Sequence, residues 1–302
     1  MQQLTFIKPG LLEWHEAASP QLQSAMDAIV RPLSVARCDL DLAAIAGKAP
    51  LLGPYAIGHE FIGEITALGD EVKNFSIGQK VIIPYQISCG ECRNCLRGAT
   101  GSCTAVPPYA MYGMPATRGF WGGALSDFVR VPFAKNMLVP VPDGIAPKTI
   151  ASISDNIVDG WRTVGPYLND IPDAEVLIVG GGALSVGLYA AAIAVALGAK
   201  KVDYVDTAQQ RLDLARTIGA NPIQGPLPKQ LGAYQITVDA SADVDGLSCA
   251  ICSTEPEGIC TSVGIYFSDQ TPVPLNRMFF IRALPSKPEE QIHALGFRTF
   301  CN

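Results

Sequence analysis

The fold class of this chain is decided by one stretch, Val176-Leu177-Ile178-Val179-Gly180-Gly181-Gly182-Ala183-Leu184-Ser185-Val186-Gly187. Its first four residues predict a short buried strand, and the glycines after them predict a tight turn that opens a helix, with helical sequence over 188–197. Lys201–Asp206 predicts a second strand and Gln209–Ile218 a second helix. Because strands and helices alternate, we predict an α/β domain with a parallel sheet over residues 151–302.

The first half of the chain has a different rhythm. Short β-type runs, such as 61–65, 80–84 and 128–131, are separated by glycine and proline at short intervals. This pattern is typical of an irregular barrel or sandwich. We therefore predict two domains, with a boundary near Ile150.

The composition excludes several classes of partner. The chain has 302 residues, 48% of them hydrophobic and 17% charged, with a formal net charge of -6. An acidic chain of this kind lacks the basic surface that nucleic acid and anionic membranes attract. No apolar run is long enough to span a bilayer, and the first residues lack the layout of a signal peptide. We expect a cytoplasmic protein that acts on small molecules.

Four of the nine cysteines form a tight cluster with C-x2-C-x2-C-x7-C spacing. The residues are Cys89, Cys92, Cys95 and Cys103. Zinc prefers four tetrahedral ligands, and four thiolates close its coordination shell, so we predict a structural zinc lobe over about residues 86–108. Four free surface thiols and an iron–sulfur cluster are the alternatives for this set.

A second group of residues with metal-binding side chains lies upstream of the cysteine cluster. Cys38 begins the motif Cys38-Asp39-Leu40-Asp41, and His59 and Glu60 lie in Gly58-His59-Glu60-Phe61-Ile62-Gly63, with Gly69 and Val72 beyond. These motifs and the cysteine cluster, in this order, resemble the zinc-containing alcohol dehydrogenases of the medium-chain dehydrogenase/reductase superfamily. The resemblance implies a GroES-like catalytic domain over 1–150 and a Rossmann-type NAD-binding domain over 151–302.

The resemblance also implies a catalytic zinc, which makes two zinc ions per chain. Cys38 and His59 would be its ligands, Asp41 would orient the His59 imidazole, and Glu60 would lie beside the metal. The third protein ligand is expected from the segment after the domain boundary. Asp155 is the predicted ligand there; Asp159 and a plain helix N-cap role for Asp155 are the alternatives.

Hydride transfer from an alcohol also needs a route for the hydroxyl proton. Many members of the family carry a serine or threonine two residues after the first zinc cysteine, but Leu40 stands there and cannot relay a proton. Ala43 occupies another relay position. Asp39 and Glu60 are the remaining nearby candidates, and the sequence does not choose between them.

The second domain carries the predicted dinucleotide site. A glycine-rich turn between a strand and a helix cradles a pyrophosphate at the helix N-terminus. Asp206 ends the next strand, where a carboxylate accepts hydrogen bonds from the adenosine ribose and repels a 2′-phosphate, so we predict NAD rather than NADP. The predicted cofactor residues are Gly180, Gly182, Ser185, Val186, Gly187, Asp206, Arg211 and Val263.

Some of these assignments have alternatives. The third glycine position of the turn is either Ser185 or, in a turn two residues longer, Gly187, and the helix that follows favours the longer turn. Arg211 matches a basic position that contacts the ribose in similar proteins, but it could equally be a solvated helix residue. Val263 resembles the strand end near the nicotinamide.

The resemblance extends from about Leu4 to Arg282 and implies a zinc-dependent oxidoreductase that passes hydride between an alcohol, polyol or sugar alcohol and NAD. The homologous assembly would be a homodimer or homotetramer. Beyond Arg282 the sequence departs from the pattern, so we expect the second domain to be truncated at its C-terminal end. The alternative function is a non-catalytic relative that keeps zinc and dinucleotide binding.

Overall fold

The computed structural model describes residues 1–302 except 116–118, 269, 277 and 279–302. The chain divides into two compact units, the first ending at Asp155 and the second beginning at Asn156. This division falls just beyond the boundary predicted near Ile150. The expectation of a truncated C-terminal end concerns residues outside the described part.

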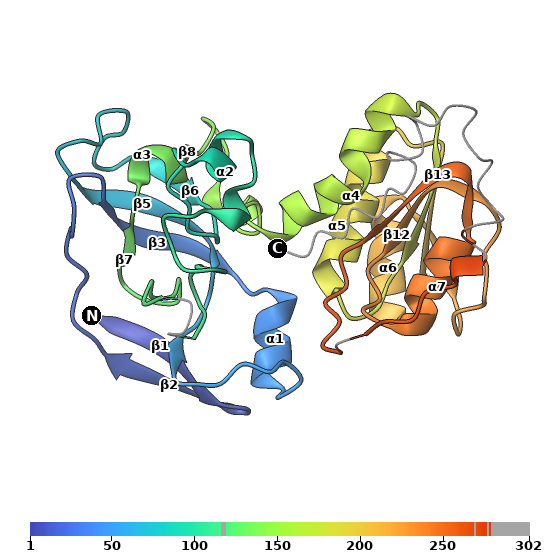
Figure 1. Ribbon diagram of the computed structural model, residues 1–302, viewed down its shortest axis with the longest axis horizontal. Coiled ribbons are helices and arrows are strands. Elements are labelled where there is room, and N and C mark those ends of the chain that lie inside the picture. The colour runs from blue at the N-terminus through green and yellow to red at the C-terminus, as the bar shows by residue number, and fades with distance from the viewer. Residues whose placement is uncertain (116–118, 269, 277, 279–302) are drawn as a thin grey trace. The chain divides into compact units, whose positions relative to one another are not determined.

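The first unit is built from two antiparallel sheets (Figure 1). The larger has the strand order β7-β3-β5-β6-β8 and the smaller the order β2-β1-β4. The strands are β1 Gln2–Lys8, β2 Leu11–Glu16, β3 Ala28–Ala36, β4 Tyr55–Ala56, β5 Glu60–Leu68, β6 Lys80–Ile83, β7 Val129–Val131 and β8 Val139–Pro140. Short helices connect them: α1 Asp39–Ile45, α2 Arg93–Leu96, α3 Ala134–Met137, and the 3-10 turns η1 Thr100–Ser102 and η3 Pro147–Thr149.

Strand β5 anchors the core of this unit. Its first residues are fully buried, and the ring of Phe61 meets the ring of Tyr112 edge-on, with centroids 5.7 Å apart. Strands β3 and β6 pair with β5 on either side. Because β5 is held on both edges and packed on the core, the residues at its start, His59 and Glu60, occupy fixed positions.

The second unit contains one parallel sheet with the order β11-β10-β9-β12-β13 (Figure 1). Its strands are β9 Glu175–Val179, β10 Lys201–Asp206, β11 Asn221–Gln224, β12 Tyr234–Asp239 and β13 Thr254–Ser262. Its helices are α4 Asn156–Asp170, α5 Leu184–Ala196, α6 Gln209–Ile218 and α7 Val244–Cys252. The chain starts in the middle at β9, runs outward to β11 and returns to β12, which is the doubly wound order.

Both faces of this sheet are covered. Helices α4, α5 and α6 pack on one face through residues such as Val164, Ala190 and Leu212, and α7 packs on the other through Cys249 and Ala250. Burial on both faces explains the continuous apolar run 176–179, all of which is fully buried. No helix in the described part of the chain is long and apolar enough to cross a membrane.

Helix α5 begins at Leu184, so the start predicted near 188 is wrong by one helical turn. Glycine is a poor helix former, and Gly187 therefore made the first turn look like a loop. In the structure Gly187 lies within the helix, where an added Cβ would approach the Cβ of Ala240 to 3.0 Å. Close packing of helix on strand outweighs the low propensity of this glycine.

The burial of β9 gives a stability test. We expect Ile178→Ala to destabilise the second unit by about 2–5 kcal/mol, because it opens a cavity beneath α4 and α5. Hydrogen-exchange mass spectrometry should show faster exchange in β9 and β10. The matched control is Ile265→Ala, whose side chain is 52% exposed, and an equal effect of both changes would contradict this account of the core.

Candidate functional site

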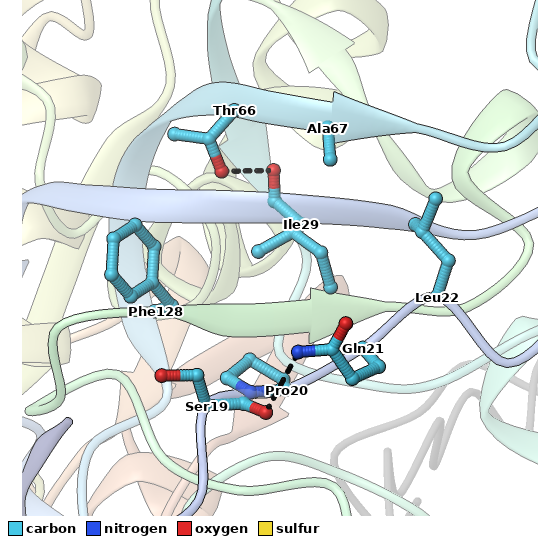
Figure 2. Close-up of a pocket in the computed structure, with 8 residues that line it drawn as sticks. All are labelled: Ser19, Pro20, Gln21, Leu22, Ile29, Thr66, Ala67 and Phe128. Carbon is cyan, nitrogen blue, oxygen red and sulfur yellow. Dashed lines mark hydrogen bonds between the residues drawn. The ribbon is translucent and has the colours of Figure 1, made fainter.

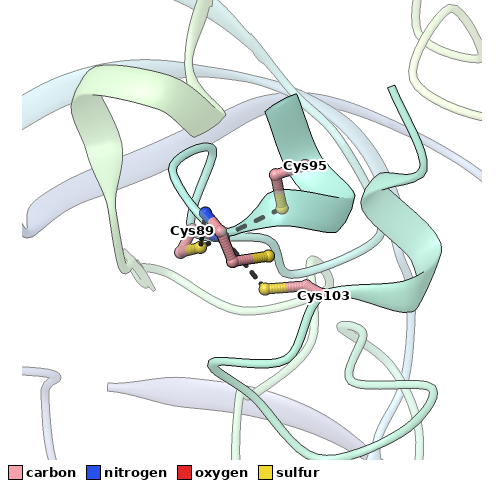
Figure 3. A group of neighbouring side chains, drawn as sticks. Cys89, Cys95 and Cys103 are labelled. Carbon is pink, nitrogen blue, oxygen red and sulfur yellow. Dashed lines mark hydrogen bonds between the residues drawn. The ribbon is translucent and has the colours of Figure 1, made fainter. Parts of the chain in front are cut away.

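Four thiols converge in the loop between β6 and β7. Cys89, Cys95 and Cys103 are buried and point toward one another in Figure 3, and Cys92 lies beside them. The sulfur atoms of Cys89 and Cys95 are 4.0 Å apart, and all four sulfurs lie within 4.8 Å of one another. Tetrahedral zinc with four thiolates needs sulfur atoms about 3.8 Å apart, so the cluster fits a zinc ion.

Backbone amides favour the thiolate at Cys92, whereas burial raises the pKa of the Cys95 thiol to about 12. The N–H groups of Glu91 and Cys92 donate to the Cys89 sulfur, at 3.4 and 3.3 Å. Hydrogen bonds from the backbone of Thr104 and Cys95 lower the pKa of the Cys92 thiol to about 5. A thiolate is the form that binds metal, so Cys92 is the thiol of this loop that is most readily available to a cation.

The loop takes its shape from two local features. Gly90 has a φ of +75°, and a Cβ there would lie 2.5 Å from the Cβ of Asn136, so only glycine fits. Asn136 donates to the Cys89 carbonyl at 2.8 Å, and Asn94 donates to the Ser102 carbonyl at 2.6 Å. These contacts hold the loop in place from both sides.

The second group of ligand-type side chains is formed by Cys38, His59, Glu60 and Asp155. All four are buried, and one ligand atom from each lies within 4.8 Å of the others. They come from the start of α1, the start of β5 and the last residue of the first unit. Sequence positions that span more than a hundred residues therefore meet at one point.

The imidazole of His59 lies between two carboxylates. Its Nδ1 lies 3.5 Å from Asp41 Oδ1, and its Nε2 lies 3.3 Å from Asp155 Oδ2. Tetrahedral zinc places a nitrogen and an oxygen ligand about 3.3 Å apart, which matches the second distance. Asp41 on Nδ1 leaves Nε2 to face Asp155, as in metal sites where a carboxylate orients a histidine.

Asp41 also connects to the thiol. Its Oδ2 accepts the backbone N–H of Cys38 at 3.2 Å, in the arrangement of a helix capping box at the start of α1. Burial raises the pKa of the Cys38 thiol to about 11 and raises that of Asp41 above its ordinary value. Burial lowers the pKa of His59, but Asp41, Asp155 and Cys38 raise it by more.

These pKa shifts reflect an excess of acidic groups in a buried site. Burying a carboxylate or thiolate is costly unless a cation compensates it. Around His59 the structure gathers Asp41, Glu60, Asp155 and Cys38, all under 10% exposed. A divalent cation would compensate the carboxylates and thiolate, so this donor set also fits a metal.

Other predicted or alternative residues lie outside this group. Asp159, the alternative ligand, forms an ion pair with Arg162 within α4 and is not among the clustered donors. Of the two acids considered for the third ligand, Asp155 is therefore the one that lies beside His59. Leu40 and Asp39 lie in the first turn of α1, and neither joins the cluster in the described chain.

The glycine-rich turn lies at the carboxyl ends of β9, β10 and β12. Gly180 donates to the Val205 carbonyl at 2.9 Å, and Gly182 donates to the Ser241 carbonyl at 2.6 Å. A Cβ at Gly180 would lie 2.5 Å from Asp206 Oδ2, so the turn and the acid at the end of β10 are close neighbours. This edge is where the strand order reverses, and ligands of doubly wound sheets bind there.

The remaining predicted cofactor residues surround this turn. Ser185 and Val186 form the first turn of α5, and Ser185 Oγ accepts a hydrogen bond from Asn156 at 2.8 Å. Gly187 follows inside the helix. Val263 comes directly after β13 and donates its N–H to the Asp239 carbonyl at 2.9 Å.

Asp206 and Arg211 are joined. Arg211 Nε and Nη2 donate to the two carboxylate oxygens of Asp206 at 2.6 and 2.7 Å. Burial raises the pKa of Asp206, but Arg211 and the other donors lower it by more, so the carboxylate is ionised at neutral pH. Arg211 is thus an ion-pair partner of Asp206 rather than a solvated helix residue.

Sequence reasoning missed a second polar centre at the same edge. The carboxylate of Asp239 is fully buried and accepts hydrogen bonds from Ser241, Ser262 and Tyr266. This network holds the Ser241 carbonyl that receives Gly182. The available signal was an acid directly after the buried strand residues 236–238, the same pattern that identified Asp206.

A shallow pocket of about 360 Å³ lies elsewhere in the first unit, between β3, β5 and the segment before β3 (Figure 2). Pro20, Leu22, Ile29 and Phe128 give it an apolar lining. None of its lining residues belongs to either ligand group, and we assign it no role in the chemistry.

Comparison with known proteins agrees with this geometry. Residues 24–143 match the Alcohol dehydrogenase GroES-like domain. A probable zinc-binding alcohol dehydrogenase of Mycobacterium tuberculosis is 30% identical over 273 residues, which cover 88% of this chain and 68% of that protein. The chain belongs to the zinc-containing medium-chain alcohol dehydrogenase family. It is therefore related to oxidoreductases, and its GroES-like and Rossmann-type units are those of the family.

Two further relatives show how much of the chain is similar to known proteins. L-threonine 3-dehydrogenase of Vibrio cholerae is 37% identical over 166 residues, covering 55% of this chain and 44% of that enzyme. The solved structure of an alcohol dehydrogenase from Thermus sp. ATN1 superimposes with a TM-score of 0.82 at 28% identity, covering 93% of this chain and 82% of that one. The chain thus spans less than half of the threonine dehydrogenase.

The cysteine cluster of this family member can be tested without activity. We expect Cys103→Ser to lower the zinc content by about one ion per chain, because three thiolates no longer close the shell. The control is Cys249→Ser, a buried thiol in the second unit. Elemental analysis of both proteins should separate them, and an unchanged zinc content in Cys103→Ser would rule out a zinc ion at this cluster.

Proposed function

We propose that this protein is a zinc-dependent dehydrogenase that transfers hydride between an alcohol and a nicotinamide dinucleotide. The observation that carries the proposal is the buried group of Cys38, His59, Glu60 and Asp155, whose ligand atoms lie within 4.8 Å of one another. A thiol, an imidazole and a carboxylate are the ligand types of catalytic zinc. Membership of the family supports the same conclusion.

Cys38, His59 and Asp155 would hold the zinc ion, which acts as a Lewis acid and makes the hydroxyl of an alcohol easier to deprotonate. Three protein ligands leave a coordination position for the substrate. Asp41 keeps the imidazole of His59 in one orientation through the 3.5 Å contact with Nδ1. Glu60 is the acid within the ligand group that is left over for a proton or for the metal.

The proton route is the least conventional part of the proposal. Leu40 has no group that can carry a proton, so the hydroxyl relay of many family members is missing here. Glu60 is clustered with the ligand atoms, whereas Asp39 is not. Glu60 is therefore our choice for the group that receives the substrate proton, directly or through water.

The hydride acceptor is proposed to bind the second unit at the turn 180–187. The turn lies at the carboxyl edge of the sheet, between β9 and β12, and helix α5 follows it with its N-terminus free of acidic residues in the first turn. A pyrophosphate is stabilised at such a position by backbone N–H groups and the helix dipole. Primary and secondary alcohols, polyols and L-threonine-like amino alcohols are the substrates to screen, and a homodimer or homotetramer is the assembly to expect.

The third metal ligand is the sharpest test. We expect Asp155→Ala to lose about one zinc ion per chain and at least about 100-fold in kcat, because an open site loses one of only three protein ligands. Asp159→Ala is the matched control, since it removes a carboxylate only four positions away that pairs with Arg162. Zinc analysis and turnover with a panel of alcohols should be measured on both variants.

Either of two outcomes would contradict the proposal. If the zinc content falls in Asp159→Ala but not in Asp155→Ala, the third ligand is Asp159 and the proposed assignment to Asp155 is wrong. A wild-type protein that holds two zinc ions, binds dinucleotide and turns over no alcohol or aldehyde would be a non-catalytic relative.

Removal of the metal provides an independent test. We expect 1,10-phenanthroline to abolish turnover and added zinc to restore it, because the catalytic ligands are few and the structural cluster has four thiolates that hold zinc more firmly. The measurement is activity against zinc content during chelation. Full activity at less than one zinc ion per chain would contradict a catalytic role for the metal.

A further inference from the structure

The carboxylate of Asp239 gathers hydrogen bonds from two segments of the chain. It ends β12 and is fully buried. Its oxygens accept the backbone N–H and the hydroxyl of Ser241, and the hydroxyls of Ser262 and Tyr266. A buried carboxylate is costly unless hydrogen bonds compensate it, and hydrogen bonds to a charged acceptor are stronger than those between neutral groups. The loss of one donor should therefore disturb the segments around this acid.

The phenol of Tyr266 brings the segment after β13 to this acid. Its hydroxyl donates to Asp239 Oδ2 at 2.7 Å, and Ser262 Oγ donates to the same oxygen at 2.7 Å. The last pair of the β12–β13 ladder is Asp239 and Ser262, so Tyr266 lies beyond the ladder. The hydrogen bond of its phenol therefore extends the connection between the two segments past the end of the sheet.

Three backbone segments approach one another closely around Ala242. A Cβ at Gly264 would lie 2.8 Å from both the Cα and the backbone nitrogen of Ala242, and a Cβ at Gly182 would lie 2.8 Å from the Ala242 Cβ. Ala242 has a φ of +52°, a left-handed conformation that is costly for alanine and persists only where the surroundings hold it. Ala242 is therefore a close neighbour of both the segment after β13 and the glycine turn.

The residues before Ala242 hold the glycine turn through their backbone. The Ser241 carbonyl accepts the N–H of Gly182 at 2.6 Å, and the Ala240 carbonyl accepts the N–H of Ala183 at 3.0 Å. Helix α5 begins at the next residue, Leu184. A displacement of the segment after β12 would thus move the start of α5, where backbone N–H groups are suited to a pyrophosphate.

We propose that Tyr266 is a positioning residue for dinucleotide binding. Through Asp239, its hydroxyl holds the segment 240–242 in place, and this segment holds the glycine turn in the form that receives a pyrophosphate. The hydroxyl acts through the acid and not by contact with the ligand. The inference rests on the proposed function for its ligand class.

The test compares Tyr266→Phe with Tyr234→Phe in the whole chain. Each change removes one phenol hydroxyl that donates to a buried acid of the same sheet, but Tyr234 donates to Asp203 of β10, outside the glycine-turn network. The affinity for NAD and for NADP is measured by isothermal titration calorimetry. We expect the nucleotide that the wild type binds more tightly to bind about 10-fold more weakly to Tyr266→Phe, as for loss of a hydrogen bond to a charged group, and equally well to Tyr234→Phe.

A second donor gives an independent reading. Ser262→Ala removes the other hydroxyl that donates to Asp239 Oδ2, so it should weaken the same nucleotide as well. The losses of affinity in Tyr266→Phe and Asp239→Asn should be less than additive in the double variant, because both changes act on one hydrogen bond. Thermal melting shows whether each variant is folded.

Hydrogen exchange separates positioning from a purely structural role. Without nucleotide, the segment 180–187 should exchange faster in Tyr266→Phe than in the wild type, and at the wild-type rate in Tyr234→Phe. A purely structural role would lower the melting temperature of Tyr266→Phe without changing either the nucleotide affinity or the exchange of this segment.

The inference is overturned if folded Tyr266→Phe or Ser262→Ala binds nucleotide as the wild type does, or if Tyr234→Phe weakens binding equally. It is also overturned if the double variant shows additive losses, or if the wild type binds neither NAD nor NADP. Because the readout is binding, a wild type that binds nucleotide without turnover, together with the loss in Tyr266→Phe, supports this inference while contradicting the proposed function.

Discussion

The cost of burying charge organises the first unit. His59 is 1% exposed and lies between the carboxylates of Asp41 and Asp155, with the thiol of Cys38 beside them. In a purely structural core such a group would be replaced by apolar side chains, which pack without any desolvation cost. The surrounding framework, with β5 paired on both edges and α1 capped by Asp41, holds this arrangement in place.

The second unit also compensates its buried charges, at the carboxyl edge of its sheet. Asp203, Asp206 and Asp239 are all buried at strand positions of β10 and β12, and each is compensated by named donors. Asp203 pairs with Lys201 and accepts hydrogen bonds from Tyr234 of β12 and from Asn221 of β11, so it connects three strands of the sheet. Asp206 and Asp239 flank the glycine turn and shape it. The buried acids of β10 and β12 therefore hold both the sheet and the glycine turn in place.

Local sequence was sufficient for much of this. The cysteine spacing predicted the cluster because all four ligands lie within fifteen residues, and β10 and α6 have the predicted bounds because their patterns are strong and their ends are marked by polar residues. Asp155 could be chosen only by resemblance, since no local pattern distinguishes it from Asp159. The start of α5, the Asp239 network and the Asp206–Arg211 pair were not predicted, because each depends on contacts between segments that are distant in the chain.

The start of helix α1 limits how the length of the chain can change. Its N-cap supplies the Cys38 thiol and, three residues later, its first turn supplies the Asp41 carboxylate that lies beside His59. One added or deleted residue between them would rotate one group about 100° around the helix axis relative to the other. The spacing of this tetrapeptide is thus a length constraint on evolution: its residues can be exchanged, as Leu40 illustrates, but its register cannot.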